Sequence, residues 1–176
     1  MKQLMDETAI KTVINRMAYE IIERNPKLYE LVFVGVKTRG QWLAKRLSDY
    51  VALLQDVLIP WCGFDVSGYR DDIDVRHITR EELLVPIVNK TVVLTDDVLF
   101  SGRTIRAAID GVIASGRPKE IQLAVLIDRG HRRLPIKADY IGKNIPTRFD
   151  EWVEVKFQEQ DNTEGVFLKK STIKKY

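Results

Sequence analysis

The sequence predicts an α/β fold with a mostly parallel central sheet. Short apolar runs rich in β-branched residues alternate along the chain with stretches that repeat apolar residues at helical spacing. Three apolar runs are followed by polar loops, at residues 37–40, 96–104 and 128–133. Because the carboxyl ends of parallel strands meet at one edge of a sheet, these loops are expected to converge on a single site.

The composition is typical of a globular chain that folds in water. Of the 176 residues, 45% are apolar and 30% are charged, which fits a single domain over residues 1–176. The net charge of +3 permits an anionic partner such as a phosphate ester or RNA but does not require one. The sequence shows neither the apolar segment of a signal peptide nor an apolar run of membrane-spanning length, so we expect no membrane partner and a cytoplasmic location.

In the first part of the chain, two helices and two strands are expected. Asp6 is placed to cap a helix whose apolar residues recur every three or four positions, and Asn25-Pro26 ends that helix. A β-branched run then predicts a buried strand, and Pro60 favours an edge position or a bulge for the second strand. The expected elements are a helix over 6–24, a strand over 28–36, a helix from about 41 to 54 and a strand within 56–70.

The second part of the chain is expected to supply further strands and one more helix. The stretch 70–82 is highly polar and predicts an exposed flap, and the polar stretch 129–151 is expected to be irregular. Gly116 marks the end of the helix. The expected elements are strands over 91–95, 120–128, 152–157 and 165–170 and a helix over 103–115.

The stretch VVLTDDVLFSGRT, residues 92–104, carries the clearest chemical signal. Small and polar residues at 101–104 open a helix, so several backbone N–H groups and the positive end of the helix dipole meet at one point. Gly102 lets the backbone approach a ligand closely, and Ser101 and Thr104 add hydroxyl groups. This turn therefore suits a phosphomonoester.

Two acidic residues, Asp96 and Asp97, come directly before this turn. Their charges would repel a phosphate, but they suit the hydroxyls of a sugar or the outer shell of a Mg²⁺ ion. A phosphate beside vicinal hydroxyls is the pattern of a ribose 5-phosphate. The whole stretch resembles the phosphoribosyl-pyrophosphate (PRPP) signature of the type I phosphoribosyltransferases, which has a hydrophobic strand, paired acids, two apolar residues and a Ser/Thr-Gly-x-Thr turn.

The loop GVKTRG, residues 35–40, resembles the pyrophosphate loop of the same superfamily. A leaving pyrophosphate requires backbone N–H donors and a cation, which Thr38, Arg39 and Gly40 offer directly after a buried strand. Such a loop is common on protein surfaces, but its position before the PRPP signature makes it informative.

Three longer stretches resemble the PyrR family, namely VGVKTRGQWLAKRL (34–47), YRDD (69–72) and IQLAVLIDRGHRRLPIKADYIGKNIPT (121–147). That family joins uracil phosphoribosyltransferase activity, which makes UMP and pyrophosphate from uracil and PRPP, to attenuation of pyrimidine operons through their leader mRNA. The resemblance implies a type I phosphoribosyltransferase fold with a small hood at about 128–150 and a flexible flap at about 69–85. It also implies Mg²⁺ bound with PRPP, UMP or UTP as effectors, and a homodimer or higher homo-oligomer.

The resemblance assigns roles to individual residues. Uracil is expected to meet Arg129, His131 and Val153, and Mg²⁺ is expected to be held through PRPP without protein ligands of its own. Cys62, the single cysteine, is expected to be a packing residue. The residues expected to act in catalysis are Asp96, Asp97, Arg39 and Arg70. The residues expected to bind PRPP or UMP are Thr38, Arg39, Gly40, Asp96, Asp97, Val98, Leu99, Phe100, Ser101, Gly102, Arg103 and Thr104.

The residues linked to RNA binding depart in part from the family pattern. Asn15 and Tyr19 stand where family members carry a Thr and a His one helical turn apart. The two residues share a helix face, and Tyr19 could stack on a base. Arg132, Lys137 and Lys143 keep the basic character of the other positions, and an Arg132→Ala change is expected to lower RNA affinity while sparing catalysis.

These departures leave more than one function open. The flap is shorter than in the family, and Gly68 stands where a bulky apolar residue is usual. The chain could be a uracil phosphoribosyltransferase that also regulates RNA, an RNA-binding nucleotide sensor with little catalysis, or a catalytic paralogue that has lost RNA binding. A purine salvage enzyme is disfavoured because Phe100 replaces the third acid of those enzymes.

Overall fold

The computed structural model describes residues 1–72, 74 and 78–170. Its centre is a five-stranded sheet in which every pairing is parallel. This confirms the expected α/β class and the expected edge position of the strand after Pro60. In spatial order the strands are β3 (Trp61–Phe64), β2 (Leu31–Val36), β4 (Thr91–Leu99), β5 (Glu120–Asp128) and β6 (Tyr140–Asn144).

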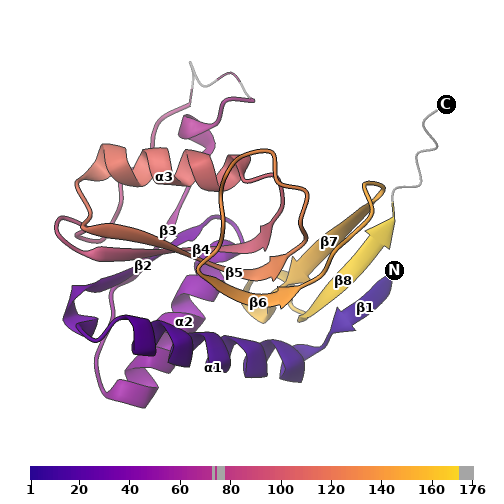
Figure 1. Ribbon diagram of the computed structural model, residues 1–176, viewed down its shortest axis with the longest axis horizontal. Coiled ribbons are helices and arrows are strands. Elements are labelled where there is room, and N and C mark those ends of the chain that lie inside the picture. The colour runs from indigo at the N-terminus through magenta and orange to yellow at the C-terminus, as the bar shows by residue number, and fades with distance from the viewer. Residues whose placement is uncertain (73, 75–77, 171–176) are drawn as a thin grey trace.

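Three long helices cover the two faces of this sheet. Helices α1 (Glu7–Arg24) and α2 (Gly40–Gln55) lie against one face, and α3 (Arg103–Ser115) lies against the other (Figure 1). Asp6 caps α1 as expected, because its carboxylate accepts the N–H of Ala9 at 2.8 Å. Two short 3₁₀ segments, η1 (Leu28–Glu30) and η2 (Ser67–Tyr69), precede β2 and the flap.

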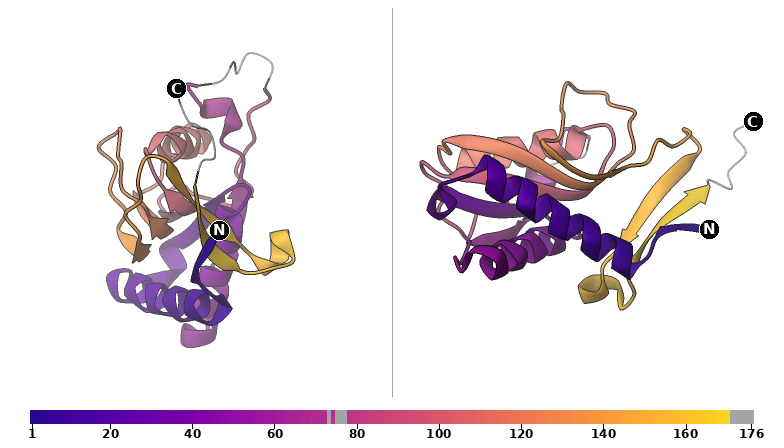
Figure 2. Two further views of the ribbon diagram at one scale, coloured as in Figure 1. Left: turned by 90° about the vertical axis from the view of Figure 1, so that its right-hand side faces the viewer. Right: turned by 60° about the horizontal axis from the view of Figure 1, so that its bottom comes forward.

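A second, smaller sheet lies beyond the carboxyl ends of the central strands (Figures 1 and 2). It is antiparallel, and its order is β1 (Lys2–Met5), β8 (Gly165–Lys170) and β7 (Glu151–Lys156). The short helix α4 (Gln158–Asp161) lies at the tip of the hairpin between β7 and β8. The pairing of β1 with β8 brings the two ends of the described chain together.

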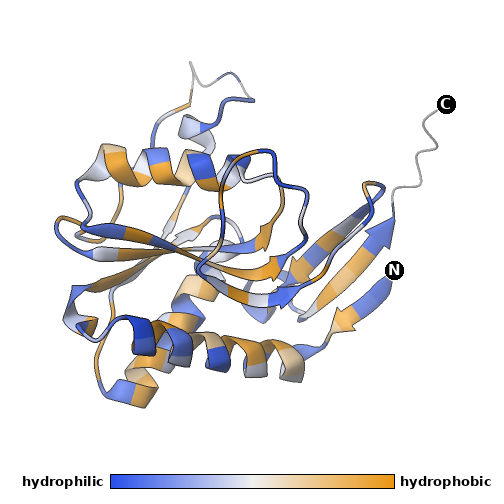
Figure 3. Cartoon of the chain, viewed as in Figure 1, coloured by the Kyte–Doolittle hydropathy of each residue, from blue (hydrophilic) through white to orange (hydrophobic). Residues whose placement is uncertain are grey.

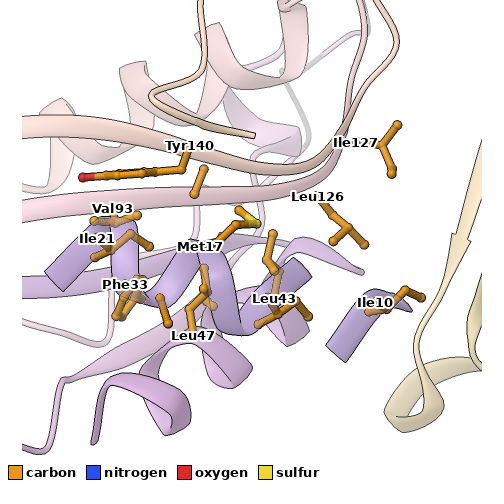
Figure 4. Packing of buried hydrophobic residues seen from close by; sticks show 14 of the residues in the cluster. Ile10, Met17, Ile21, Phe33, Leu43, Leu47, Val93, Leu126, Ile127 and Tyr140 are labelled. Atoms are coloured by element: carbon orange, nitrogen blue, oxygen red, sulfur yellow. The ribbon is translucent and has the colours of Figure 1, made fainter. Parts of the chain in front are cut away.

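Two apolar clusters hold these layers together. One lies between the sheet and helices α1 and α2, where Met17, Leu47, Phe33 and Leu126 are all fully buried (Figure 4). The other lies between the sheet and α3. Around the helices hydrophobic and hydrophilic residues alternate, as one buried face requires (Figure 3). Within the described ranges, no helix has the length and apolar character that crossing a bilayer requires.

Several expected boundaries were wrong, and each has a physical reason. The strand expected over 91–95 continues to Leu99, because β5 pairs with it as far as Leu99, so the two acids lie inside a strand. The stretch 129–151, expected to be irregular, contains β6, which pairs with β5. The first three residues of the strand expected over 28–36 form η1 instead. Elements β1 and α4 were not expected from the sequence.

Candidate functional site

The acid pair lies near the carboxyl end of β4, the middle strand of the central sheet. Asp96 is buried and Asp97 is half-buried. The N–H of Asp97 donates to Oδ1 of Asp96 at 3.0 Å, and the N–H of Val98 donates to Oδ1 of Asp97 at 3.0 Å. Burial raises the pKa of both carboxyls, and the charge of Asp97 raises the pKa of Asp96 further. The pair therefore gains from a ligand that supplies hydroxyl groups or positive charge.

The turn after β4 has the geometry expected of an anion site. Gly102 is the N-cap of α3 and has φ = 90°, a conformation that glycine adopts without strain. The N–H groups of a helix's first turn have no partner within the helix, so those of α3 face the turn. The N–H of Arg103 bonds the hydroxyl of Ser101 at 3.3 Å, and the Ser101 carbonyl accepts the N–H of Arg133 at 2.9 Å. The turn is thus fixed from both sides.

The loop before α2 is pressed against the acid pair. The hydroxyl of Thr95 donates to the carbonyl oxygen of Gly40 at 2.7 Å. A Cβ atom at position 40 would lie 2.6 Å from the carbonyl oxygen of Thr95 and 3.0 Å from the Cα of Asp96. The peptide bond between Lys37 and Thr38 is cis. The close approach of Gly40 brings the loop expected to bind pyrophosphate beside the acids expected to bind ribose.

Arg39 is tied to the smaller sheet. Its Nε and Nη2 atoms donate to the carboxylate of Asp161 at 3.2 and 2.6 Å. The hydrogen bonds to Asp161 raise the pKa of Arg39, burial opposes this rise, and the negative charge of Asp97 adds to it. The negative charge of the acid pair therefore acts on Arg39, while Asp161 in α4 holds its guanidinium group. Asp161 was not predicted as a site residue, because a single acid in a polar turn has no distinctive pattern.

Arg129, expected to touch uracil, is buried at the end of β5. Its Nε donates to the hydroxyl of Thr147 at 3.0 Å and its Nη2 to the carbonyl of Glu151 at 2.6 Å. Its guanidinium carbon lies 4.0 Å from the ring centroid of Phe100. Burial lowers the pKa of Arg129. Two of its nitrogens thus bond the 147–151 segment, while its guanidinium lies on Phe100 in the turn after β4, so Arg129 connects the two.

His131 lies in an aromatic cluster with Phe100 and Phe149. The His131 and Phe149 ring centroids are 4.4 Å apart, and Phe100 meets His131 edge-on at 6.1 Å. Since a carbonyl oxygen can only accept, the Nε2 of His131 donates to Thr147 at 2.5 Å. Phe149 is 75% exposed, an unusual setting for a phenyl ring beside a polar site. Val153, the third residue expected near uracil, is buried on β7 within the apolar cluster that includes residues of α1 and α2.

Arg132 is occupied by contacts within the protein. Its Nε donates to the carbonyl of Ile136 at 3.0 Å, its Nη1 to the carbonyl of Phe100 at 2.9 Å, and its Nη2 pairs with Asp128. These contacts close the loop after β5 and fasten it to the turn after β4. The role in RNA binding that was expected of Arg132 stays a prediction.

The flap is attached at both ends to the parts that carry the site. Asp71 pairs with Arg103 at 3.2 Å, at the start of α3, and Glu81 pairs with Lys37 at 2.5 Å. Arg70, expected to act in catalysis, pairs with Asp72 at 2.5 Å. Of the flap, residues 73 and 75–77 lie outside the described residues.

Gly68, which departs from the family pattern, packs against Arg80 in the later part of the flap. A Cβ atom at position 68 would lie 2.9 Å from the Cγ of Arg80. The guanidinium of Arg80 lies 4.9 Å from the ring centroid of Tyr69, and its Nε donates to the carbonyl of Gly68 at 3.3 Å. Arg80 therefore fills the space beside Gly68. Cys62 is buried in the adjacent edge strand, as expected for a packing residue.

Apart from Arg132, the residues expected to bind RNA lie on α1, on β6 and in the loop before β6. Tyr19 is 54% exposed on α1, and Lys143 is exposed on β6. Arg16 joins the two elements, because its Nη2 donates to the carbonyls of Ile141 and Gly142 at 3.1 and 2.5 Å. Asn15 is half-buried on α1, and Lys137 is exposed in the loop before β6.

The comparisons with known proteins agree with this geometry. A family model of the phosphoribosyl transferase domain matches residues 1–161. The "Bifunctional protein PyrR" of Lactococcus lactis subsp. cremoris SK11 is 49% identical over 169 residues, which cover 96% of this chain and 97% of that protein. The "Pyrimidine operon regulatory protein" of L. lactis subsp. cremoris MG1363 matches over the same shares at 49% identity.

Solved structures are similar in fold at much lower identity. The hypoxanthine phosphoribosyltransferase of Trypanosoma cruzi superposes with a TM-score of 0.72 over 97% of both chains, at 22% sequence identity. At this identity the similarity shows the fold alone. The shared fold, the PRPP-type strand and turn, and the full-length similarity to curated relatives lead to one conclusion: the chain belongs to the PyrR family of phosphoribosyltransferases.

Proposed function

We propose that this protein transfers the phosphoribosyl group of PRPP to uracil, forming UMP and pyrophosphate, and also regulates a pyrimidine operon through its leader mRNA. The observation that carries the catalytic part is the placement of Asp96 and Asp97 between the Gly40 loop and the Gly102 turn. One strand end thereby offers sites for a ribose, a pyrophosphate and a 5′-phosphate. The printed names of the curated relatives support the regulatory part.

Each part of PRPP is proposed to meet one part of the site. The first turn of α3, from Ser101 to Thr104, binds the 5′-phosphate through N–H groups and hydroxyls. Asp96 and Asp97 accept hydrogen bonds from the ribose hydroxyls. Arg39 and the backbone of the loop before α2 bind the pyrophosphate. Because all three groups of PRPP are held at once, the C1′ carbon is fixed in the orientation that the reaction requires.

The reaction is proposed to pass through an oxocarbenium-like state. The bond between C1′ and the pyrophosphate oxygen breaks, its electron pair leaves with pyrophosphate, and a uracil ring nitrogen forms the new bond to C1′ and loses its proton. Arg39 stabilises the charge that grows on the leaving group, and Arg70 on the flap is proposed to add to this effect. Exclusion of water by the flap protects C1′ from hydrolysis.

Mg²⁺ fits this site as a companion of PRPP. Among the described residues, no three His, Cys, Asp or Glu side chains gather as a metal cluster. The carboxylate oxygens of Asp96 and Asp97 are hard donors of the kind Mg²⁺ prefers, and a nearby cation would offset the cost of burying their negative charges, the same cost that raises their pKa values. When bound, the ion supplies positive charge to the pyrophosphate.

Uracil is proposed to lie at the loop that follows β5, beside His131 and above the buried Val153. In this proposal Arg129 acts through Phe100 and the 147–151 segment, since two of its nitrogens bond that segment. Phe100 stands beside the site as an apolar residue, which favours a pyrimidine over a purine that requires an acid there.

The RNA site is proposed to lie along α1 and β6, on the surface that carries Asn15, Tyr19, Lys137 and Lys143. The exposure of Tyr19 and Lys143 is the observation that favours it. We further propose that the protein acts as a homo-oligomer and that UMP or UTP in the PRPP pocket is the effector. A nucleotide sensor with little catalysis and a catalytic paralogue without RNA binding remain the two alternatives to test.

The deciding experiment is UMP formation from uracil, PRPP and Mg²⁺ by the purified protein, with hypoxanthine as the control base. Turnover with uracil but not with hypoxanthine supports the enzyme. Absence of turnover together with UMP binding favours the sensor. The Asp97→Asn variant is expected to fold and to lose roughly a hundredfold in turnover, since it removes a charge that acts on the reacting sugar. Unchanged turnover in this variant contradicts the proposed role of the acids.

A further inference from the structure

One face of helix α2 is clamped by the hairpin tip formed by residues 157–164. Arg39, Trp42 and Arg46 follow one another at intervals of three and four residues, so they share this face. Each of them contacts the hairpin. The contacts are Arg39 Nη2 to Asp161 at 2.6 Å, Trp42 Nε1 to Gln160 at 3.4 Å, Arg46 Nη2 to Glu159 at 2.8 Å and Arg46 Nη1 to Glu164 at 2.6 Å.

The contact between Asp161 and Arg39 differs from the others because it involves a residue of the loop that is proposed to bind pyrophosphate. Arg46 lies on the second turn of α2, away from the substrate loop, and pairs with two acids of the hairpin. Arg39 is the N-cap of α2 and belongs to the loop that Gly40 presses against the acid pair. The hairpin therefore reaches the pyrophosphate loop through one residue, Asp161.

Asp161 is itself firmly held. Its carboxylate accepts the N–H of Phe157 at 3.0 Å, and its side chain is only 14% exposed. Two N–H groups of Arg39, on Nε and Nη2, point at it in the fork geometry that fixes the plane of a guanidinium. A guanidinium has five N–H groups, and hydrogen bonds to the described residues use two of those on Arg39, so three are left for a ligand.

We infer that Asp161 is a positioning residue for the transfer reaction. It fixes the orientation of Arg39, so that the remaining donors of this side chain face the pyrophosphate of PRPP. The inference rests on the proposed function, and it extends the site from the central sheet to the hairpin of the smaller sheet. Without Asp161 the long side chain of Arg39 regains its rotamer freedom, which PRPP binding must then restrict.

A competing effect has the opposite sign and can be separated by experiment. Asp161 neutralises part of the charge of Arg39, so its removal could strengthen the attraction for pyrophosphate. If positioning dominates, the Asp161→Asn variant has a KM for PRPP about tenfold higher, which corresponds to one lost charged hydrogen bond. The KM for uracil stays unchanged. If neutralisation dominates, the KM for PRPP falls instead.

Four variants test the inference. Asp161→Asn keeps the size of the side chain and one acceptor oxygen for Phe157. Glu159→Gln is the matched control, because Glu159 belongs to the same hairpin and contacts the same face of α2 but pairs with Arg46. The third and fourth are Arg39→Lys alone and Arg39→Lys combined with Asp161→Asn, which together show whether Asp161 acts through Arg39. The readouts are KM and kcat for each substrate and the thermal shift that Mg²⁺ and pyrophosphate cause.

The expected result is a selective rise in the KM for PRPP and a smaller pyrophosphate-induced thermal shift in Asp161→Asn. Glu159→Gln is expected to lose melting temperature without either change. In the Arg39→Lys background, Asp161→Asn is expected to have little further effect. An unchanged or lower KM for PRPP, an equal effect of Glu159→Gln, or additive effects in the double variant overturns the inference. Absence of UMP formation by the wild-type protein counts against the proposed function, and the thermal shifts still decide the role of Asp161.

Discussion

The hydroxyl of Thr95 and the carbonyl oxygen of Gly40 lie 2.7 Å apart, although 55 positions separate the two residues in the chain. This hydrogen bond connects the loop that starts α2 to the strand that carries the acid pair. Both ends are backbone or short side-chain groups, so the connection has little freedom. The distance between the proposed pyrophosphate and ribose contacts is thereby set by the central sheet.

The Gly40→Ala variant is expected to disturb this connection. The new methyl group would lie 2.6 Å from the carbonyl oxygen of Thr95, a backbone atom that cannot move aside. We expect a loss of about 1–3 kcal/mol in the free energy of unfolding and a clear rise in the KM for PRPP. Gly116→Ala is the control, because its methyl group would meet movable side-chain atoms of Ile87 at 3.1 Å. Equal PRPP kinetics in the two variants would contradict this account.

The buried acid pair makes a specific contribution to the pH dependence of stability. Burial raises the pKa of Asp96 above its ordinary value of 3.8, so the folded state binds more protons than the unfolded state from that pH upward. The free energy of unfolding therefore falls as pH rises through the window between the unfolded and the folded pKa. Each unit of elevation corresponds to about 1.4 kcal/mol.

The Asp96→Asn variant is expected to remove this loss of stability at rising pH. Its stability relative to wild type is expected to increase as pH rises above about 4 and then to level off, while UMP formation falls. Urea unfolding at a series of pH values measures the difference. Asp110→Asn, which changes an exposed carboxylate on α3, serves as the control. A stability difference that does not vary with pH would show that Asp96 is not a source of this dependence.

The helices and strands could be predicted from the sequence only where the local pattern and the tertiary structure agree. The helix over 103–115 was predicted with its observed bounds, because apolar spacing and a glycine turn at its start both mark it. Strand β6 was missed because YIGKN is short and mixes polar with apolar residues. Its Gly142 packs so closely that a Cβ atom would lie 2.4 Å from the carbonyl oxygen of Leu126. Pairing with β5, and not local propensity, makes this segment a strand.

The side-chain partners could not be predicted at all, because they depend on packing between distant segments. Arg39 and Arg129 were both identified as site residues from the resemblance. Their partners Asp161 and Thr147 lie 122 and 18 positions away and have no pattern of their own. The sequence indicated which cations to consider, whereas the folded chain determines which of their nitrogens are free.

Arg129 is expected to be irreplaceable by lysine. An ammonium group cannot bond Thr147 and Glu151 together while lying flat on Phe100, since it lacks the planar fork of the guanidinium. Arg129→Lys should cost about 2 kcal/mol in the free energy of unfolding and raise the KM for uracil. The exposed Arg133 offers the control Arg133→Lys. Wild-type uracil kinetics in Arg129→Lys would show that the 147–151 segment needs no such support.

Arg132 and Lys143 should separate the two proposed activities. Arg132 holds Asp128 and two backbone carbonyls, so Arg132→Ala is expected to impair UMP formation and RNA binding together. This revises the expectation from sequence that catalysis would be spared. Lys143 is exposed on β6, so Lys143→Ala should leave catalysis intact and weaken RNA binding at low salt.

The salt dependence of RNA binding then identifies the kind of contact that Lys143 makes. If its ammonium group binds a phosphate, Lys143→Ala makes the negative slope of log K against log salt shallower by about one, because one fewer counterion is released. Leader RNA titrated at several salt concentrations gives this slope, and Lys137→Ala provides a second exposed lysine for comparison. A variant with weaker binding but an unchanged slope would place Lys143 against a base or outside the interface. Loss of catalysis in Lys143→Ala would contradict the separation of the RNA surface from the PRPP pocket.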